Sequence, residues 1–262
     1  MKESRVINFC NQKGGTSKTT GSINLGVALA NMGKKVLLVD LDSQSSLTIS
    51  LGFEPEDLKF TLSDILYGRI KDDQFIIEKE KYLLHAEGVD ILPSDMKLAG
   101  VETAMANAEI REHILKGVID EFRDLYDFII IDSLPSLGLL NTNGLTASDS
   151  VIIPVSAQYL PMKGMEQLLV TIRRIRRRLN PQLEIEGILV TMFDKRTTLS
   201  KEVKTTIEGI YNDEVRIFES VIPISTKIAE APSQGQSIFS YDPKNIAAER
   251  FISLAAEVIR NV

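Results

Sequence analysis

The feature that most constrains the fold of this chain is a segment rich in glycine and lysine, residues 11–20, with the sequence NQKGGTSKTT. A short apolar run, residues 5–10, precedes it, and an amphipathic segment, residues 23–31, follows it. Strand, glycine-rich loop and helix in this order are typical of a phosphate-binding loop, whose backbone N–H groups and helix N-terminus hold anionic oxygens. Such a loop would place the Lys18 ammonium on the β- and γ-phosphates of a nucleotide and offer the Thr19 hydroxyl to Mg²⁺.

The loop departs from the general pattern G-x-x-x-x-G-K-[ST], because Gln12 and Ser17 stand at its two glycine positions. It carries instead a second lysine, Lys13, five residues before Lys18. This arrangement resembles the deviant Walker A loop, KGGxxK[ST], of the ParA/MinD family of ATPases. The alternative is an ordinary glycine-containing turn with two solvated lysines. The resemblance implies that ATP and Mg²⁺ are bound by Lys13, Gly14, Gly15, Thr16, Ser17, Lys18, Thr19 and Thr20.

A pair of carboxylates, Asp40 and Asp42, follows the apolar run at residues 36–39. Carboxylates at positions i and i+2 where a strand ends can point into the same cleft and act on a metal and on a water molecule. The alternative is a solvated acidic turn. ParA-like proteins carry a DxDPQ-type sequence here, which implies that Asp42 positions or activates the attacking water and Asp40 supports the Mg²⁺ environment. Ser43 replaces the usual proline and Ser45-Ser46 the usual Gly-Asn, which predicts a less rigid loop.

A third motif, residues 128–132 (FIIID), has the Walker B pattern of an apolar strand that ends in aspartate. Such a strand brings a carboxylate, here Asp132, beside Mg²⁺, usually through a bound water molecule. Alone the pattern is weak, but here it follows the other two motifs in the correct order. The resemblance extends from residue 6 to residue 259 and implies that Met192 and Pro223 also contact the nucleotide.

Short apolar runs that alternate with helical patterns predict the rest of the fold. Near-continuous apolar strands separated by helices are typical of a parallel sheet covered on both faces, with ligands at the carboxyl ends of its strands. We therefore expect one α/β domain over residues 1–262, a P-loop NTPase with a mostly parallel twisted sheet and no DNA-binding extension before it. Gly52 to Glu87 is expected to be a surface elaboration. After the first run, further strands are expected at residues 36–39, 89–92, 128–131, 151–155, 185–190 and, less clearly, 220–223.

The composition limits the classes of protein that remain. The chain has 262 residues, 44% of them hydrophobic, which is enough for one substantial core. Its net charge of −6 argues against a uniformly basic nucleic-acid-binding protein but allows a local basic patch. The one cysteine, Cys10, excludes an internal disulfide and disfavours a metal-cluster reductase relative. No signal peptide is evident and no apolar run approaches the ~20 residues that span a bilayer, so we expect a cytoplasmic, nucleoid-associated protein that does not bind membranes.

The densest basic run lies within residues 167–179 (QLLVTIRRIRRRL). On a helix its arginines spread over an arc of roughly 200°, opposite an aliphatic stripe. This surface suits non-specific, salt-sensitive contact with DNA phosphates, and the alternative is a solvated face paired with nearby acids. Together with two basic positions that the family resemblance indicates, the candidate DNA contacts are Arg173, Arg174, Arg177, Arg196 and Lys227.

The resemblance is to the short ParA/Soj type and implies a catalytic set of Lys13, Lys18 and Asp42. In this family the lysine at the position of Lys13 reaches across an ATP-sandwich homodimer to the partner's phosphates. The implied activity is slow ATP hydrolysis, stimulated by a centromere-binding ParB-like protein, with binding to non-specific double-stranded DNA and segregation of a plasmid or chromosome. The alternatives are an orphan ParA-like positioner of a protein cargo, a MinD-like membrane switch, and a nucleotide-binding scaffold with negligible turnover.

Overall fold

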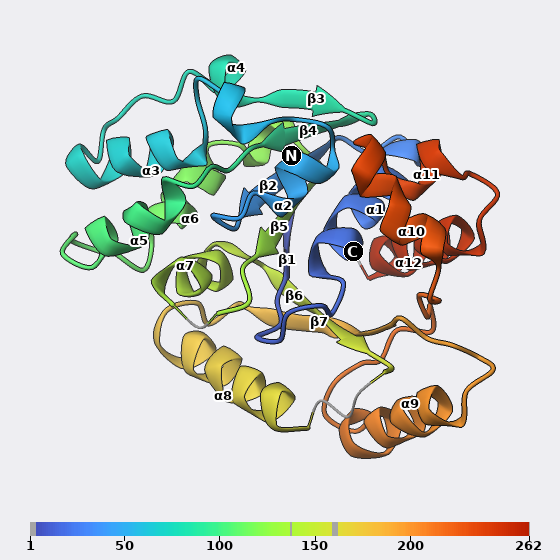
Figure 1. Ribbon diagram of the computed structural model, residues 1–262. Helices are drawn as coiled ribbons and strands as arrows, with labels where there is room; N and C mark the ends of the chain where they lie inside the picture. Colours follow the sequence, from blue (N-terminus) through green and yellow to red (C-terminus); the bar gives the residue numbers. More distant parts are fainter. Residues whose placement is uncertain (1–3, 137, 159–161, 262) are drawn as a thin grey trace.

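Seven runs of mostly apolar residues form the strands of one sheet, which has the order β3-β4-β2-β5-β1-β6-β7 (Figure 1). A computed structural model describes residues 4–136, 138–158 and 162–261. The strands pair in parallel, except that β3 is antiparallel to β4 at one edge. The strands are β1 (Arg5–Phe9), β2 (Val36–Leu41), β3 (Leu84–Ala86), β4 (Val89–Leu92), β5 (Phe128–Ser133), β6 (Ser150–Ser156) and β7 (Glu184–Thr191).

Helices cover both faces of this sheet, as the apolar strands predict. The α-helices are α1 (Lys18–Asn31), α2 (Ser46–Ser50), α3 (Leu62–Lys71), α4 (Lys79–Tyr82), α5 (Leu98–Met105), α6 (Ile114–Asp120), α7 (Leu139–Ala147), α8 (Met162–Arg178), α9 (Thr198–Tyr211), α10 (Thr226–Glu230), α11 (Ile238–Tyr241) and α12 (Ile246–Arg260). The short 3₁₀ helices of the described residues are η1 (Pro55–Asp57), η2 (Arg123–Leu125) and η3 (Ala231–Gln234). Among the described residues no helix combines the length and the apolar character needed to cross a membrane.

Alternation along the strands assigns each side chain to one face of the sheet. On β2, Leu38 belongs to a core shared with α1 and α12, whereas its neighbour Leu37 belongs to the core shared with α3, α5 and α6. A third cluster joins β6 and β7 to α8 and α9. The prediction of a single α/β domain with a mostly parallel sheet and helices on both faces is confirmed.

Two details of the predicted sheet were wrong. Residues 220–223 form no strand: Ile222 donates one backbone hydrogen bond to Val190, and a single bridge joins Phe193 to Pro223. The two hydrogen bonds of this bridge are donated by Phe193 and Ile224, and Pro223, which has no N–H, donates none. Sequence reasoning also missed β3, which turns into β4 through Glu87 and Gly88, both with positive φ (55° and 77°). That two-residue turn has the backbone of a tight hairpin.

The segment from residue 52 to residue 87 is more than the expected surface elaboration. It contains α3, whose Leu62, Ile65 and Leu66 are fully buried in the core beneath β2. A capping box between Thr61 and Asp64 starts this helix, because each residue's side chain satisfies the backbone of the other. The segment therefore supplies part of one helical layer.

The register of the central strands brings three predicted motifs together at the carboxyl ends of these strands. Asp132 at the end of β5 lies beside Phe9 of β1 on one side and beside Asp40 of β2 on the other. The loops that follow these three strands must therefore leave the sheet next to one another. This end of the sheet is where the candidate site lies.

The last helix is anchored by a buried carboxylate, which gives the first prediction. Glu257 on α12 accepts hydrogen bonds from the N–H groups of Glu219 (3.0 Å) and Ser220 (2.8 Å). Glu257→Ala leaves both donors without this acceptor, so we expect the free energy of unfolding to fall by about 3 kcal/mol in urea denaturation. Ser253→Ala, on the exposed side of α12, should change it by less than about 0.5 kcal/mol. Equal effects of the two substitutions would contradict the anchoring role.

Candidate nucleotide-binding site

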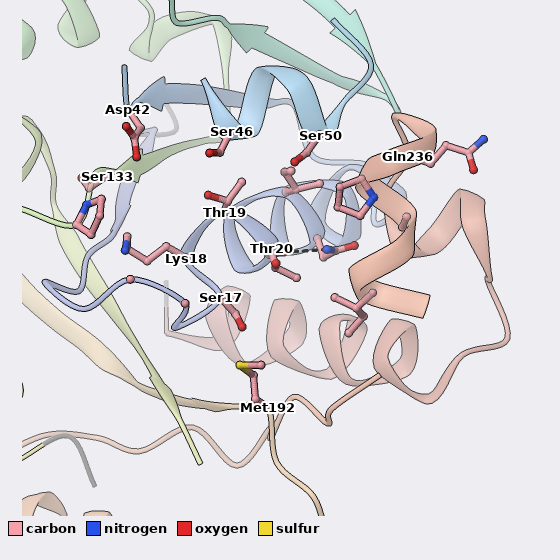
Figure 2. A pocket seen from close by; sticks show the side chains of 18 residues that line it. Ser17, Lys18, Thr19, Thr20, Asp42, Ser46, Ser50, Ser133, Met192 and Gln236 are labelled. Carbon is pink, nitrogen blue, oxygen red and sulfur yellow. Dashed lines mark hydrogen bonds between the residues drawn. The ribbon is translucent and has the colours of Figure 1, made fainter. Parts of the chain in front are cut away.

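The loops after β1, β2, β5 and β7 border a cavity of about 440 Å³ (Figure 2). On one side α1 presents Lys18 and Thr19, and on the other side α2 presents Ser46 and Ser50. The structure thus brings together most of the residues predicted to hold the nucleotide. Those that line this cavity are Gly14, Gly15, Ser17, Lys18, Thr19, Thr20 and Met192, and Asp42, predicted to position the attacking water, lines it too.

The loop that precedes α1 has two residues in the left-handed region, Gly15 (φ 71°) and Ser17 (φ 66°). Ser17 occupies the second glycine position of the general pattern, and its backbone explains why glycine is usual there, since a Cβ atom is disfavoured at positive φ. The Asn11 side chain ties the loop to the neighbouring strand β6. Asn11 accepts from the Lys13 N–H (3.0 Å) and donates to the Pro154 carbonyl (2.7 Å).

The two lysines of the loop have different environments. Lys18 is 8% exposed, and its ammonium lies 3.4 Å from the carbonyl oxygen of Lys13. Burial lowers the pKa of Lys18, and the nearby carboxylate of Asp132 opposes this shift. The Lys13 side chain is exposed and is not among the residues that line the cavity of its own chain. One loop therefore directs one cation inward and presents a second outside.

Behind the cavity wall, Asp132 connects β5 to the first turns of α1. Its carboxylate accepts hydrogen bonds from the hydroxyls of Thr19 (2.6 Å) and Ser22 (3.0 Å). Burial nevertheless raises the pKa of Asp132 to about 6. Because the Thr19 hydroxyl donates its proton to Asp132, its lone pairs remain available to a cation. Sequence reasoning missed Ser22, although the i, i+3 spacing from Thr19 places both hydroxyls on one side of the helix.

The two carboxylates of the second motif do not share the cavity. Asp42 is partly exposed and lines it, and one of its oxygens accepts from the Gln44 N–H at 3.0 Å. Asp40 is fully buried behind the wall, where it accepts from the backbone and the hydroxyl of Thr48. Burial, and secondarily the charge of Asp132, raises the pKa of Asp40 to about 7. The structure therefore places Asp42 at the cavity and Asp40 among the buried residues behind the cavity wall.

A second, more apolar cavity of about 480 Å³ adjoins the first. Pro223 lines this cavity and not the first one, and Ser17, Thr20 and Met192 line both. Met192 has a positive φ of 51°, which is uncommon for a residue with a side chain of this size. Sequence reasoning assigned no role to the C-terminal residues that complete the walls. They include Ile228, Pro232 and Gln236.

The predicted DNA-contacting residues are exposed but lie on three separate elements. Arg173 on α8 pairs with Glu214 at 3.0 Å, and Lys227 pairs with Glu230 at 2.9 Å. Arg196 makes two side-chain hydrogen bonds to Asp194, at 3.0 and 2.9 Å. Within the described part of the chain, Arg174 and Arg177 on α8 form no ion pair. Both arginines are exposed on that helix.

The Asp132 contacts give the second prediction. Ser22→Ala removes one of the two hydroxyls that stabilise the charged carboxylate, so the pKa of Asp132 should rise above its present value of about 6. Carbon-detected NMR titration of the nucleotide-free protein would measure this, with Asp132→Asn to assign the signal. Ser240→Ala, on the distant α11, should leave the titration unchanged. A pKa of Asp132 that stayed constant or fell in Ser22→Ala would contradict the hydrogen-bond assignment.

Comparisons with known proteins show which family this chain is similar to. A family model described as an AAA domain matches residues 4–185. The chain is 44% identical over 257 residues to the sporulation initiation inhibitor protein Soj of Bacillus subtilis, covering 98% of this chain and 99% of that protein. It is 38% identical over 255 residues to the chromosome-partitioning ATPase Soj of Treponema pallidum, covering 97% of each.

A solved structure of a Mycobacterium smegmatis protein, named cobyrinic acid a,c-diamide synthase and containing ADP and magnesium, has the same fold. Its TM-score to this chain is 0.84 at 34% identity, covering 98% of this chain and 95% of that one. Similarity of this extent to proteins of one kind, together with the two-lysine loop at the cavity, identifies the family. The chain belongs to the ParA/Soj/MinD family of P-loop ATPases.

Proposed function

We propose that this protein is a DNA-partition ATPase that dimerises around two ATP molecules and binds non-specific double-stranded DNA in that state. The observation that carries this proposal is the different placement of two lysines in one loop, because Lys18 faces the cavity and Lys13 is exposed outside it. A cation outside its own cavity can complete a neighbour's site. The name of the Treponema pallidum relative, chromosome-partitioning ATPase Soj, supports a role in chromosome partitioning.

The triphosphate of ATP fits the first cavity. The N-terminus of α1 and the backbone N–H groups of residues 14–19 favour anionic oxygens, and Lys18 adds a positive charge there. The adjoining apolar cavity, which contains Met192 and Pro223, suits the flat adenine ring. The nucleotide would therefore span both cavities, across the residues that the two share.

The residues around Thr19 fit a magnesium ion. Thr19 would hold the ion through its hydroxyl oxygen, and Asp132 would act from behind, through that hydroxyl or a water molecule. A bound Mg²⁺ would neutralise negative charge that develops on the phosphate oxygens. Among the described residues no group of three or more His, Cys, Asp or Glu could hold a metal, which suits an ion that takes its other ligands from phosphate and water.

Hydrolysis also requires a positioned water molecule, and Asp42 is placed to provide it. Its carboxylate lines the cavity from the loop after β2 and can accept a hydrogen bond from the attacking water. Lys13 of a second subunit would then supply positive charge to the transferred phosphoryl group. A cation supplied in trans in this way can be worth ~10³–10⁵ in rate. A centromere-binding ParB-like protein would stimulate this step and release the ATPase from DNA.

The third prediction separates assembly from chemistry. Lys13→Ala should lose both the ATP-dependent dimer and turnover, because it removes the cation that bridges the subunits. Asp42→Ala should keep the dimer and lower turnover by about 10³-fold. Light scattering after size-exclusion chromatography and a phosphate-release assay would measure the two properties.

Lys59→Ala, which replaces another exposed lysine, is the matched control for this experiment and should retain both properties. A wild-type protein that stayed monomeric with ATP would overturn the sandwich-dimer proposal. Full turnover in Asp42→Ala would overturn the role of that carboxylate.

The fourth prediction concerns DNA. The double substitution Arg174→Ala, Arg177→Ala should weaken ATP-dependent binding to duplex DNA of any sequence and reduce the slope of log K against log salt by about 2 for each subunit that contacts the DNA. Arg196→Ala should have a smaller effect, because Asp194 already neutralises that arginine. Fluorescence anisotropy at several salt concentrations would measure both. Retention on anionic liposomes rather than on DNA would favour the MinD-like alternative.

A further inference from the structure

The backbone of Asp42 is held on both sides of its Cα atom. Its N–H donates to the Asp40 carboxylate at 3.2 Å, and its carbonyl oxygen accepts from the Ser94 hydroxyl at 2.8 Å. The same carbonyl also accepts from the Ser45 N–H at 2.9 Å. The side chain of Asp42 is left to face the cavity. The position of this carboxylate is therefore set by bonds to its own peptide groups.

The groups that hold Asp42 also hold one another. Thr48 on α2 donates its N–H (2.9 Å) and its hydroxyl (2.7 Å) to the Asp40 carboxylate. The Thr48 hydroxyl oxygen in turn accepts from the Ser94 N–H at 3.2 Å. Hydrogen bonds thus form a closed ring through Asp42, Asp40, Thr48 and Ser94. We call this ring the Asp42 clamp.

The Asp42 clamp joins two consecutive elements to a third segment that is distant in sequence. Asp40 lies in β2, Thr48 in α2, and Ser94 in the segment that follows β4. Asp40, Thr48 and Ser94 are all 0% exposed, so water does not compete for these bonds. Hydrogen bonds in such a low-dielectric environment are strong, and leaving one partner unpaired is costly.

The loop that the clamp holds lacks the residues that would stiffen it by themselves. Ser43 stands in place of a proline, and Ser45 has a positive φ of 53° without being glycine. The Asp42 side chain lies outside the clamp, and among the described residues its one hydrogen bond is from the nearby Gln44 N–H. The clamp therefore supplies the rigidity that the sequence of the loop does not.

We propose that Thr48 and Ser94 are positioning residues for ATP hydrolysis, which act by fixing Asp42 at the cavity. This inference rests on the proposed role of Asp42. Neither residue lines the first cavity, where the triphosphate is proposed to bind. Their loss should disturb the geometry of the water-positioning carboxylate and leave the binding of ATP intact.

The test uses the full chain with Thr48→Val, Ser94→Ala and Thr48→Ser. We expect kcat to fall about 10- to 100-fold in the first two, because a displacement of ~1 Å in a catalytic group can cost about 10²-fold. The KM for ATP and the ATP-dependent dimer should stay within about twofold of wild type. Thr48→Ser keeps the hydroxyl and should therefore keep turnover close to wild type. If turnover depended on the threonine methyl group instead, Thr48→Ser would be as slow as Thr48→Val.

Thr146→Val is the matched control. It also replaces a buried threonine, but one whose hydroxyl bonds only to the Thr142 carbonyl of its own helix (2.8 Å). Turnover in this variant should stay close to wild type. If Thr146→Val lost as much kcat as Thr48→Val, the effect would be general destabilisation and the proposal would be wrong. If Thr48→Val does not fold, the smaller change in Ser94→Ala decides the question.

A double-mutant comparison separates this inference from the function on which it rests. In an Asp42→Ala background, Thr48→Val should lower turnover no further, because both substitutions remove the same positioned carboxylate. An inactive Asp42→Ala together with wild-type kcat in Thr48→Val and Ser94→Ala would overturn the clamp and leave the proposed function standing. An active Asp42→Ala would overturn the proposed function itself.

Discussion

The site depends on a buried carboxylate between the sheet and the helix that carries the phosphate-binding loop. Asp132 is 1% exposed, and a charge at such depth is unfavourable unless hydrogen bonds satisfy it. The hydroxyls of Thr19 and Ser22 on α1 provide those bonds. They also set the position of α1 relative to β5. The hydrogen bonds that the buried Asp132 carboxylate requires therefore hold the loop of Lys13 and Lys18 at the carboxyl ends of the strands.

Backbone conformations that are unfavourable for most residues are concentrated at this end of the sheet. Five non-glycine residues with positive φ occur in the described part of the chain, and three of them, Ser17, Ser45 and Met192, border the cavity or lie in its loops. Such conformations persist only where the surroundings impose them. Here hydrogen bonds impose these conformations. The Thr191 hydroxyl donates to the Thr16 carbonyl, next to Ser17, and the Asp42 clamp holds the loop that contains Ser45. The site therefore combines strained loops with a rigid frame.

The sequence was sufficient to predict the parts of the molecule that depend on local pattern. Apolar runs identified six of the strands, and the order of the motifs along the chain located the cavity. The prediction that Asp40 and Asp42 could share a cleft relied on the alternation of side chains in a strand. That alternation stops at Leu41, where β2 ends, so Asp40 points into the interior and Asp42 belongs to a loop.

Contacts between distant segments could not be predicted from local sequence patterns. Thr48 and Ser94 are 46 residues apart, and no spacing rule joins them. The exposed arginines were visible as a run, but the acid that pairs with Arg173, Glu214, lies 41 residues away. The antiparallel β3 is short and partly exposed, so it lacks the apolar character by which the other strands were recognised.

Cys10, at the end of the first strand, has a practical consequence for the study of this protein. It is the one cysteine in the sequence, it is completely buried, and burial raises the pKa of its thiol to about 11. A maleimide at neutral pH would therefore find neither access to the sulfur nor a thiolate to attack. A cysteine introduced on the surface could carry a single fluorophore while the native residue stays in place, so the proposed assembly of two subunits could be followed directly with labelled protein.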